Sequence, residues 1–465
     1  MGSLPGILLL VLGLLLSVGL HEIGHLLPAK KFGVKVPQYF IGFGPTVWST
    51  TKGETEYGLK ALPLGGYVRL AGMVWPGRQD RQQVNRRGNV TIAEETRRAS
   101  AEELSEQDQP RAFWRLNAGK RLIVMFGGPL MNFLTAAVLL AVVMSGIGAL
   151  QPSNQIATVS TCVSQTDACQ NDDPQAPGAQ AGILPGDVIV SWDGVPVSDW
   201  DVIQQAIATG GTKTASVMVE RDGRELALLV TPVLAERPVV DQNGQLVTDS
   251  EGQTLTEQRP YVGIGPGYAH ERVSLSQIPG ELWNLTSGTA KVILKLPADL
   301  WNTTTGLFTG ADRSQSGVMG IVGAADVAGS ITSSDQSAYD TSARIGDLLL
   351  LIASLNISLF LFNLLPLLPL DGGHIVGAAY EGGRRQIAKL RVKPDPGPVD
   401  IARLMPLGYI VAALFIAMTL MLIVADIVNP VFCASKARPG PDARRSARLS
   451  SPRRDSPPRR QSGIL

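Results

Sequence analysis

Four long apolar runs decide what this chain can fold into. The runs are Leu4–Leu20, Leu122–Ile147, Ile345–Leu370 and Leu407–Ile427. Each is close to or above the ~20 residues that a helix needs to cross the hydrocarbon core of a bilayer. Helices in a soluble core rarely reach such lengths with so few charges, so we expect four transmembrane helices. Their expected bounds are 1–29, 122–147, 345–373 and 407–427.

The first run is expected to be a retained helix. No Lys or Arg precedes it, and it ends in His21-Glu22-Ile23-Gly24-His25 instead of the small residues that a signal peptidase cuts.

Composition narrows the class of protein further. Only 17% of the 465 residues are charged, against about 25% in a soluble domain. Lys+Arg total 41 and Asp+Glu 40, which argues against a globally basic nucleic-acid binder. Three cysteines exclude a disulfide-built scaffold and a zinc ribbon of four thiolates.

The basic residues of the loops predict an orientation. Residues 26–121 hold 16 Lys or Arg and residues 374–404 hold 6, whereas the much longer stretch 148–344 holds only 10. The first and third loops are therefore expected in the cytoplasm, and the middle segment and both termini outside. The tail after Val431 carries 9 Lys or Arg, which favours the cytoplasm by the same rule. That conflict stays open.

The first loop, 30–121, contains two distinctive segments. Glu54–Met73 alternates imperfectly between apolar and polar residues and contains several glycines, so we expect a membrane-associated β-hairpin that dips toward the membrane. An amphipathic loop on the membrane surface is the alternative. Gln79–Arg111 is rich in Arg, Gln and Glu, which predicts a polar surface insertion, helical in part around Thr91–Glu106.

The middle segment predicts a small β-rich domain over 155–233. Turn residues at Pro185-Gly186-Asp187, Asp193-Gly194 and Asp222-Gly223 separate short apolar stretches. We expect a helix at Asp199–Ala208 and strands at Lys213–Glu220 and Glu225–Pro232. Residues 234–344 are expected to be an extracytoplasmic linker region, and 434–465 a disordered basic tail.

The end of the first run carries a metal-binding pattern. His21 and His25 are four residues apart, so they share one side of a helix, and Glu22 lies beside them. In the H-E-x-x-H pattern of zinc hydrolases, two imidazoles bind zinc and the glutamate activates a water. Such a short pattern also occurs by chance. In that case the three side chains would extend to the membrane interface without binding a metal. Ionisable groups cost about 2.5–3.5 kcal/mol at the bilayer centre, which favours a function.

The third run supplies a further ligand. Catalytic zinc needs a third protein ligand and an open position for water. Asp371 is the only acidic residue between Asp347 and Glu381, and the predicted topology brings it to the same membrane face as His21 and His25. Zn²⁺ is therefore the expected cofactor. His374, three residues later, is a rival third ligand.

A disulfide is expected between Cys162 and Cys169. They lie seven residues apart in the segment placed outside the cytoplasm, where disulfides persist. The polar stretch between them lets their Cα atoms approach within the roughly 4.4–6.8 Å that a disulfide requires. Two free thiols are the alternative. Cys433 has no obvious partner.

Several motifs together resemble a known family. HEIGH and the string Asn363–His374 (NLLPLLPLDGGH) are similar to the site-2 protease family of intramembrane zinc metalloproteases. The segment Ala181–Gly194, with its GILPGDVIVSWDG string, resembles a PDZ domain, which points to the bacterial RseP-like type. The strings Phe43–Pro45, Leu64–Val68 and Gly127–Asn132 also fit, in the right order.

The resemblance, which covers most of residues 3–430, implies a fold and a set of site residues. The fold is a multi-pass α-helical membrane protein with four transmembrane helices and an inserted extracytoplasmic PDZ-like domain. His21, His25 and Asp371 would be zinc ligands and Glu22 the catalytic base. Substrate would be held by Asn363, Gly65 and Gly66. Some relatives have two PDZ domains, whereas this chain has room for one.

The implied activity is cleavage of transmembrane segments in single-pass membrane proteins, of the anti-sigma-factor or remnant-signal-peptide type, in the bacterial inner membrane. The PDZ-like domain would bind an extended peptide. A membrane-anchored PDZ scaffold or chaperone and a metal transporter are the alternatives. Neither needs a carboxylate next to a zinc-bound water, so Glu22 disfavours both.

Overall fold

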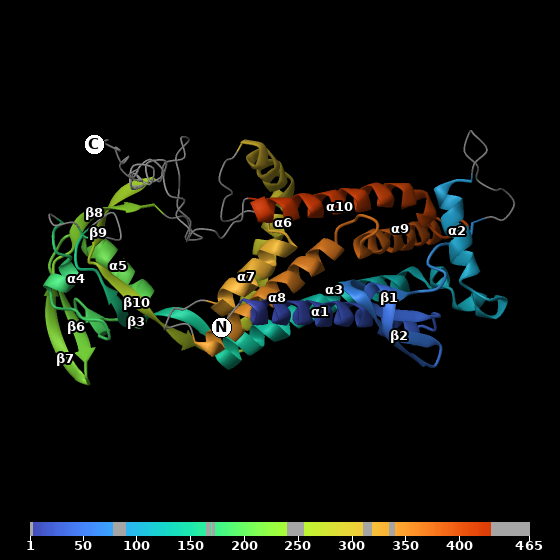
Figure 1. The fold of residues 1–465 in the computed structure, drawn as a ribbon. Helices are drawn as coiled ribbons and strands as arrows, with labels where there is room; N and C mark the ends of the chain where they lie inside the picture. Colours follow the sequence, from blue (N-terminus) through green and yellow to red (C-terminus); the bar gives the residue numbers. More distant parts are fainter. Residues whose placement is uncertain are drawn as a thin grey trace, which may run out of the picture.

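The computed structural model describes residues 3–77, 90–163, 169, 173–239, 255–309, 319–333 and 340–428. The predicted tail, 434–465, and the start of the predicted polar insertion lie outside these residues. Figure 1 shows a bundle of long helices with a β-rich domain at one end. A small sheet and the helix α2 lie at the other end.

Four helices of the described chain are long and apolar enough to cross a membrane. They are α1 (Leu4–Lys31), α3 (Ala118–Ala141, continued by a π-helical turn over Val142–Ile147), α8 (Thr341–Asn363) and α10 (Met405–Val428). The four apolar helices expected from the sequence are therefore confirmed.

The remaining elements are shorter or more polar. The further α-helices are α2 (Ile92–Glu102), α4 (Pro177–Gln180), α5 (Trp200–Gly210), α6 (Ile278–Thr309), α7 (Ile321–Ser333) and α9 (Asp371–Leu390). Single 3₁₀ turns cover Glu106–Arg111, Phe113–Arg115 and Ile401–Leu404. The strands are β1 (Gln38–Lys52), β2 (Thr55–Arg69), β3 (Ala149–Val159), β4 (Val188–Trp192), β5 (Val195–Pro196), β6 (Ala215–Arg221), β7 (Arg224–Val230), β8 (Val233–Pro238), β9 (Thr256–Tyr261) and β10 (Ile264–Glu271).

The third apolar run is not one helix to its end. Helix α8 stops at Asn363, the chain turns, and α9 begins at Asp371. Pro366 and Pro369 explain the break, because proline lacks the N–H that continues a helix. Asp371 consequently lies in the first turn of a new helix rather than at the end of the old one.

The first loop contains a β-hairpin, but its strands differ from those expected within Glu54–Met73. Most of that stretch is one strand, β2, and its partner is β1, which the sequence analysis left unassigned. Both strands bend, so that Gln38–Ile41 lies between Gly66–Arg69 and Glu56–Leu59. In the part of the chain that the structure describes, Gly66–Arg69 has a strand neighbour on one side only.

The β-rich domain is built on a sheet with the order β10-β3-β4-β6-β7, with β5 paired to β4. The strands β8 and β9 form a separate ribbon. The expected helix and two strands are confirmed as α5, β6 and β7, and the turn at Asp222 and Gly223 has positive φ at both residues. The sheet extends beyond 155–233, because β3 begins at Ala149 and β10 closes its edge.

The core of this domain is one cluster of apolar side chains. The fully buried side chains of its core include Ile156, Ile183, Ile189, Ile203, Val217 and Val219.

The region predicted as a linker, 234–344, contains two helices, α6 and α7. Helix α6 mixes apolar and polar residues, which hid it from a search for uniformly apolar runs. Its first turns pack through Ile278 and Leu282 on α3 and α8. Near its other end, the Thr304 hydroxyl hydrogen-bonds Met421 of α10.

A buried polar contact joins α1 to α8. The Asn356 amide donates to the Ser17 hydroxyl at 2.9 Å and to the Ile352 carbonyl at 2.8 Å. Asn356 is fully buried, and Ser17 lies one turn before His21. Interhelical amide contacts of this kind contribute about 0.6 kcal/mol each in a membrane protein.

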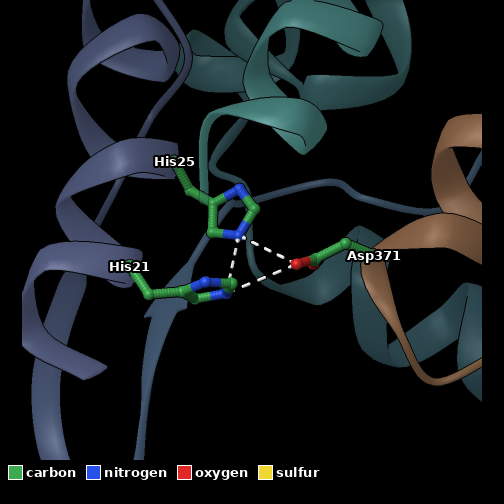
Figure 2. Close-up of side chains that lie close together, drawn as sticks. All are labelled: His21, His25 and Asp371. Atoms are coloured by element: carbon green, nitrogen blue, oxygen red, sulfur yellow. Dashed lines mark hydrogen bonds and ion pairs between the residues drawn. The ribbon is translucent and has the colours of Figure 1, made fainter. Parts of the chain in front are cut away.

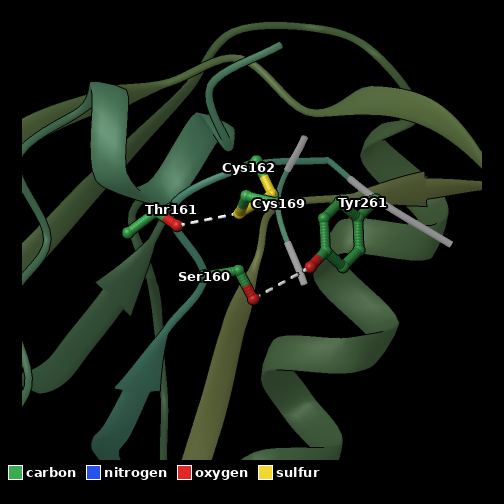
Figure 3. Close-up of a disulfide and its surroundings, with 5 residues drawn as sticks. All are labelled: Ser160, Thr161, Cys162, Cys169 and Tyr261. Atoms are coloured by element: carbon green, nitrogen blue, oxygen red, sulfur yellow. Dashed lines mark hydrogen bonds between the residues drawn. A yellow bond between two sulfur atoms is a disulfide. The ribbon is translucent and has the colours of Figure 1, made fainter. Parts of the chain in front are cut away.

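Cys162 and Cys169 form a disulfide, as expected, with their Cα atoms 5.9 Å apart (Figure 3). The Thr161 hydroxyl lies 3.0 Å from Cys169 Sγ, and the hydroxyl of Tyr261, at the end of β9, hydrogen-bonds the Ser160 hydroxyl. The disulfide therefore ties Cys169 to Cys162, just beyond the end of strand β3.

An ion pair secures the start of β4. Asp187 is almost fully buried and accepts two hydrogen bonds of 2.7 Å from the Arg221 guanidinium and one from the Leu184 N–H. Burial raises the pKa of Asp187, but Arg221 and the Leu184 N–H outweigh it, so that the pKa lies below its ordinary value.

Replacing the arginine should loosen this domain in a pH-dependent way. Arg221→Ala should destabilise this domain near neutral pH, because it removes charge-assisted hydrogen bonds from a buried carboxylate. The folded-state pKa lies below that of the unfolded chain, so the stabilisation is present above the ordinary carboxyl pKa and is lost as the pH falls through the folded value. Hydrogen exchange of Val188–Trp192 measures it. A variant that exchanges like the wild type at pH 7 would contradict the assignment.

Candidate metal centre

Three side chains from distant parts of the sequence converge inside the bundle (Figure 2). His21 and His25 come from α1, and Asp371 comes from the first turn of α9. The separations His21 Nε2–His25 Nε2, His21 Nε2–Asp371 Oδ2 and His25 Nε2–Asp371 Oδ2 are each 3.3 Å. In the described part of the chain, this is the group of His, Cys, Asp and Glu side chains that could hold a metal ion.

The spacing of these atoms fits a tetrahedral metal site. Zinc binds histidine nitrogen and carboxylate oxygen at about 2.0–2.1 Å, and tetrahedral angles then separate the ligand atoms by about 3.3–3.4 Å. The observed triangle has that size. Three protein ligands leave the fourth corner open, which is the arrangement of a catalytic rather than a structural zinc site.

The contacts of Asp371 Oδ2 and His25 Nε2 favour a bound cation. Asp371 Oδ2 is buried without a hydrogen bond of good geometry. His25 Nδ1 lies 2.8 Å from the Val124 carbonyl, which can only accept, so Nδ1 carries a proton, and Nε2 of the neutral imidazole is left as a lone pair facing the carboxylate. A lone pair and a carboxylate oxygen repel each other unless a positive charge lies between them.

Close packing of α1 on α3 positions the two histidines. A Cβ on Gly24 would lie 2.2 Å from the Gly127 carbonyl oxygen, and a Cβ on Gly127 would lie 2.0 Å from the Gly24 carbonyl oxygen. Only glycine permits this approach, as at other membrane helix crossings. A Cβ on Gly128 would meet His25 Nε2 at 2.2 Å, so the next glycine makes room for the imidazole.

A buried ion pair holds α9 against α3. Arg121 at the start of α3 pairs with Glu381 in α9, and both side chains are almost fully buried. Glu381 also accepts from the Val399 N–H and pairs with Arg385. The pair fixes α9 ten residues after Asp371, and so limits how far Asp371 can move from the histidines.

Glu22 lies where the β1–β2 sheet meets α1. The backbone of Val68 in β2 lies near the Glu22 carboxyl group. A Cβ on Gly66 would lie 3.3 Å from Glu22 Cγ and 2.8 Å from a methyl of Val18. The Tyr39 hydroxyl in β1 bonds the Gly19 carbonyl at 2.9 Å. The sheet is therefore docked on α1 at the level of the histidines.

The other residues proposed from the sequence are not members of the three-residue group. Among the described residues, His374 is outside the group that could hold a metal, and its Nδ1 is buried without a partner. Asn363 is the last residue of α8, and no hydrogen bond or ion pair joins it to the three described side chains of the site. Gly65 has positive φ and approaches the Phe43 ring.

Sequence reasoning missed three residues that support the site. Arg121 and Glu381 form the buried pair described above, and Asn132 contacts His21 from α3. A signal was present for two of them, since Arg121 borders and Asn132 interrupts an otherwise apolar run.

Comparisons with known proteins match most of the chain. Residues 9–404 match the model of Peptidase family M50. The chain is 33% identical over 439 residues to zinc metalloprotease Rip1 of Mycobacterium tuberculosis, covering 92% of this chain and 98% of that protein. Identity to Rip1 of Mycolicibacterium smegmatis is 32%, with the same coverage. Metalloprotease MmpA of Caulobacter vibrioides is 31% identical, over 80% of this chain and 85% of its own length.

The zinc affinities of Asp371→Ala and His374→Ala should show which of the two residues binds the metal. Asp371→Ala should lower zinc affinity by more than the roughly 10–100-fold expected of a residue that only supports a ligand. His374→Ala should stay within or below that range, because its ring lies outside the triangle. Competition with a zinc chelator in detergent measures both. Equal losses, or a larger loss from His374→Ala, would exchange the two assignments.

Proposed function

The chain belongs to peptidase family M50, and we propose that it is an intramembrane zinc endopeptidase that cuts the transmembrane segments of single-pass membrane proteins. As a member of this family it is a zinc metalloprotease and a multi-pass membrane protein. The proposal for where it cuts is carried by one observation. His21 and His25, two of the three residues of the metal triangle, lie on α1, which is itself long and apolar enough to cross a membrane.

The depth of the site supports cleavage within the bilayer. Helix α1 ends with Lys30 and Lys31, which are suited to the membrane surface. His25 lies five residues earlier, about 7 Å deeper at 1.5 Å per residue. The irregular backbone between α8 and α9 lies beside it, and non-helical backbone at membrane depth is tolerated where it lines a polar cavity or is covered by protein.

The residues then take distinct roles. His21, His25 and Asp371 would hold the zinc, which acts as a Lewis acid on the scissile carbonyl and on the attacking water. Glu22 accepts the proton of that water and returns it to the leaving amine. Strand β2 packs against the Glu22 side chain at Gly66 and so limits where that side chain can lie.

A free strand edge offers a way to hold the substrate. A helical peptide bond is shielded by its own hydrogen bonds, so the substrate must be extended before it is cut. Gly66–Arg69 has one strand neighbour in the described chain and passes beside Glu22. An extended substrate segment would add to this edge as a further strand. Gly65, Gly66 and Asn363 are the proposed substrate-binding residues.

The β-rich domain is proposed to be a PDZ-like domain that binds an extended peptide outside the cytoplasm. The GILPGDVIVSWDG string and the antiparallel sheet with one helix support this assignment. The proposed location is the bacterial inner membrane, with anti-sigma factors or remnant signal peptides as substrate types. A PDZ scaffold without proteolysis would leave Glu22 and the metal triangle without a role.

Replacement of Glu22 should abolish cleavage without affecting zinc binding. Glu22→Gln keeps the size of the side chain but cannot accept the proton, so cleavage of a model transmembrane substrate should fall by about 10²–10⁴-fold. Zinc content should stay that of the wild type, because Glu22 is not in the ligand triangle. Substantial cleavage by the zinc-loaded variant would remove Glu22 from this role.

Thiol labelling tests the proposed orientation. Leu229 in β7 and Val392 after α9 are both highly exposed, at 71% and 94%. In a Cys433→Ser background, an impermeant reagent added to whole cells should label Leu229→Cys. It should label Val392→Cys only after the membrane is opened. The reverse pattern would invert the topology.

A further inference from the structure

Helix α3 contacts both histidines of the site on the side away from Asp371. His25 Nδ1 lies 2.8 Å from the Val124 backbone carbonyl. His21 Nδ1 lies 3.1 Å from the side-chain amide of Asn132. The two rings are thus held by their Nδ1 atoms, and both Nε2 atoms point at Asp371 (Figure 2).

The Asn132 side chain is buried and only partly satisfied. It is 1% exposed, and its oxygen Oδ1 has no hydrogen-bond partner. An unpaired amide oxygen inside an apolar bundle is costly, typically by about 1–3 kcal/mol. The residue is also not needed to bring α1 and α3 together, because the backbones already touch at Gly24 and Gly127.

Metal binding would explain why the buried Asn132 amide lies beside His21. A histidine that binds zinc through Nε2 carries its proton on Nδ1, and that N–H almost always donates to a carbonyl, a carboxylate or a water. Val124 provides the acceptor for His25. For His21, the described group at Nδ1 is the Asn132 amide, and a half-turn about its last bond exchanges Nδ2 and Oδ1.

We propose that Asn132 is a positioning residue of the metal centre, whose amide oxygen accepts the Nδ1–H of His21 and holds Nε2 toward Asp371. This inference rests on the ligand set of the proposed function. It makes α3 the element that orients both histidine ligands, one through the backbone and one through a side chain.

Asn132 substitutions test the inference by zinc affinity. Full-length protein in detergent is titrated with zinc against a competing chelator. Asn132→Ala should weaken zinc binding roughly 10–100-fold, the effect typical of a lost partner behind a histidine ligand. Asn132→Asp keeps an acceptor oxygen at the same place and should bind zinc within about threefold of the wild type or more tightly.

Asn356→Leu is the matched control. Asn356 is also a buried asparagine that hydrogen-bonds α1, but its partner is Ser17 and not a histidine. It should leave zinc affinity unchanged while lowering thermal stability by a similar amount to Asn132→Ala. Equal loss of zinc affinity in the two variants would mean that helix packing alone is responsible, and would overturn the proposal.

Two further outcomes separate this inference from the proposed function. Wild-type affinity in Asn132→Ala, with zinc binding abolished by His21→Ala, would contradict the role of Asn132 alone. Zinc binding that survives His21→Ala would contradict the ligand set, and the role of Asn132 with it.

Discussion

The contact between the backbones of α1 and α3 at Gly24 and Gly127 is the constraint on which the rest of the site depends. It sets the distance from α3 to His21 and His25, and it leaves space beside Gly128 for the His25 ring. With that distance fixed, the Val124 carbonyl and the Asn132 amide reach the Nδ1 atoms of the two histidines. A single added methyl group at either glycine would separate the helices and move both rings away from Asp371.

The other half of the site is held by charges at the end of the bundle where α2 lies. Arg121 and Glu381 tie α9 to α3, and Arg97 in α2 pairs with Asp400 just before α10. Buried ion pairs contribute little net stability, because desolvation offsets their attraction, but breaking one leaves an uncompensated charge. Their effect here is geometric. They restrict where α9 begins, and Asp371 is in its first turn.

The sequence predicted what local pattern determines. The four apolar helices follow from length and composition, and His21, Glu22 and His25 follow from helical spacing. The disulfide between Cys162 and Cys169 follows from a short polar loop. Asp371 follows from its place as the only acidic residue between Asp347 and Glu381, at the end of the third apolar run, and the family-like motif supports it as the third ligand.

Most of the features that the sequence did not predict depend on contacts between distant segments. The β1–β2 pairing is an exception, because it is a local hairpin closed by Lys52 and Thr55, and its turn signal at Gly53 was not recognised. Strand β10 joins β3 across more than a hundred residues. Helix α6 is apolar on only part of its surface, so a search for uniform runs passed over it. Asn132 was noted only as the end of the family-like string Gly127–Asn132, and its contact with His21 depends on the packing of α1 on α3.

The central claim is that two imidazoles and one carboxylate hold a zinc ion in this chain. X-ray absorption at the zinc edge of the purified protein tests it directly. The account predicts four nitrogen or oxygen ligands at about 2.0–2.1 Å, with outer-shell scattering from two imidazole rings and no sulfur ligand. Scattering from three imidazoles would place His374 in the ligand set instead of Asp371, and a sulfur ligand at about 2.3 Å would place the zinc at another site.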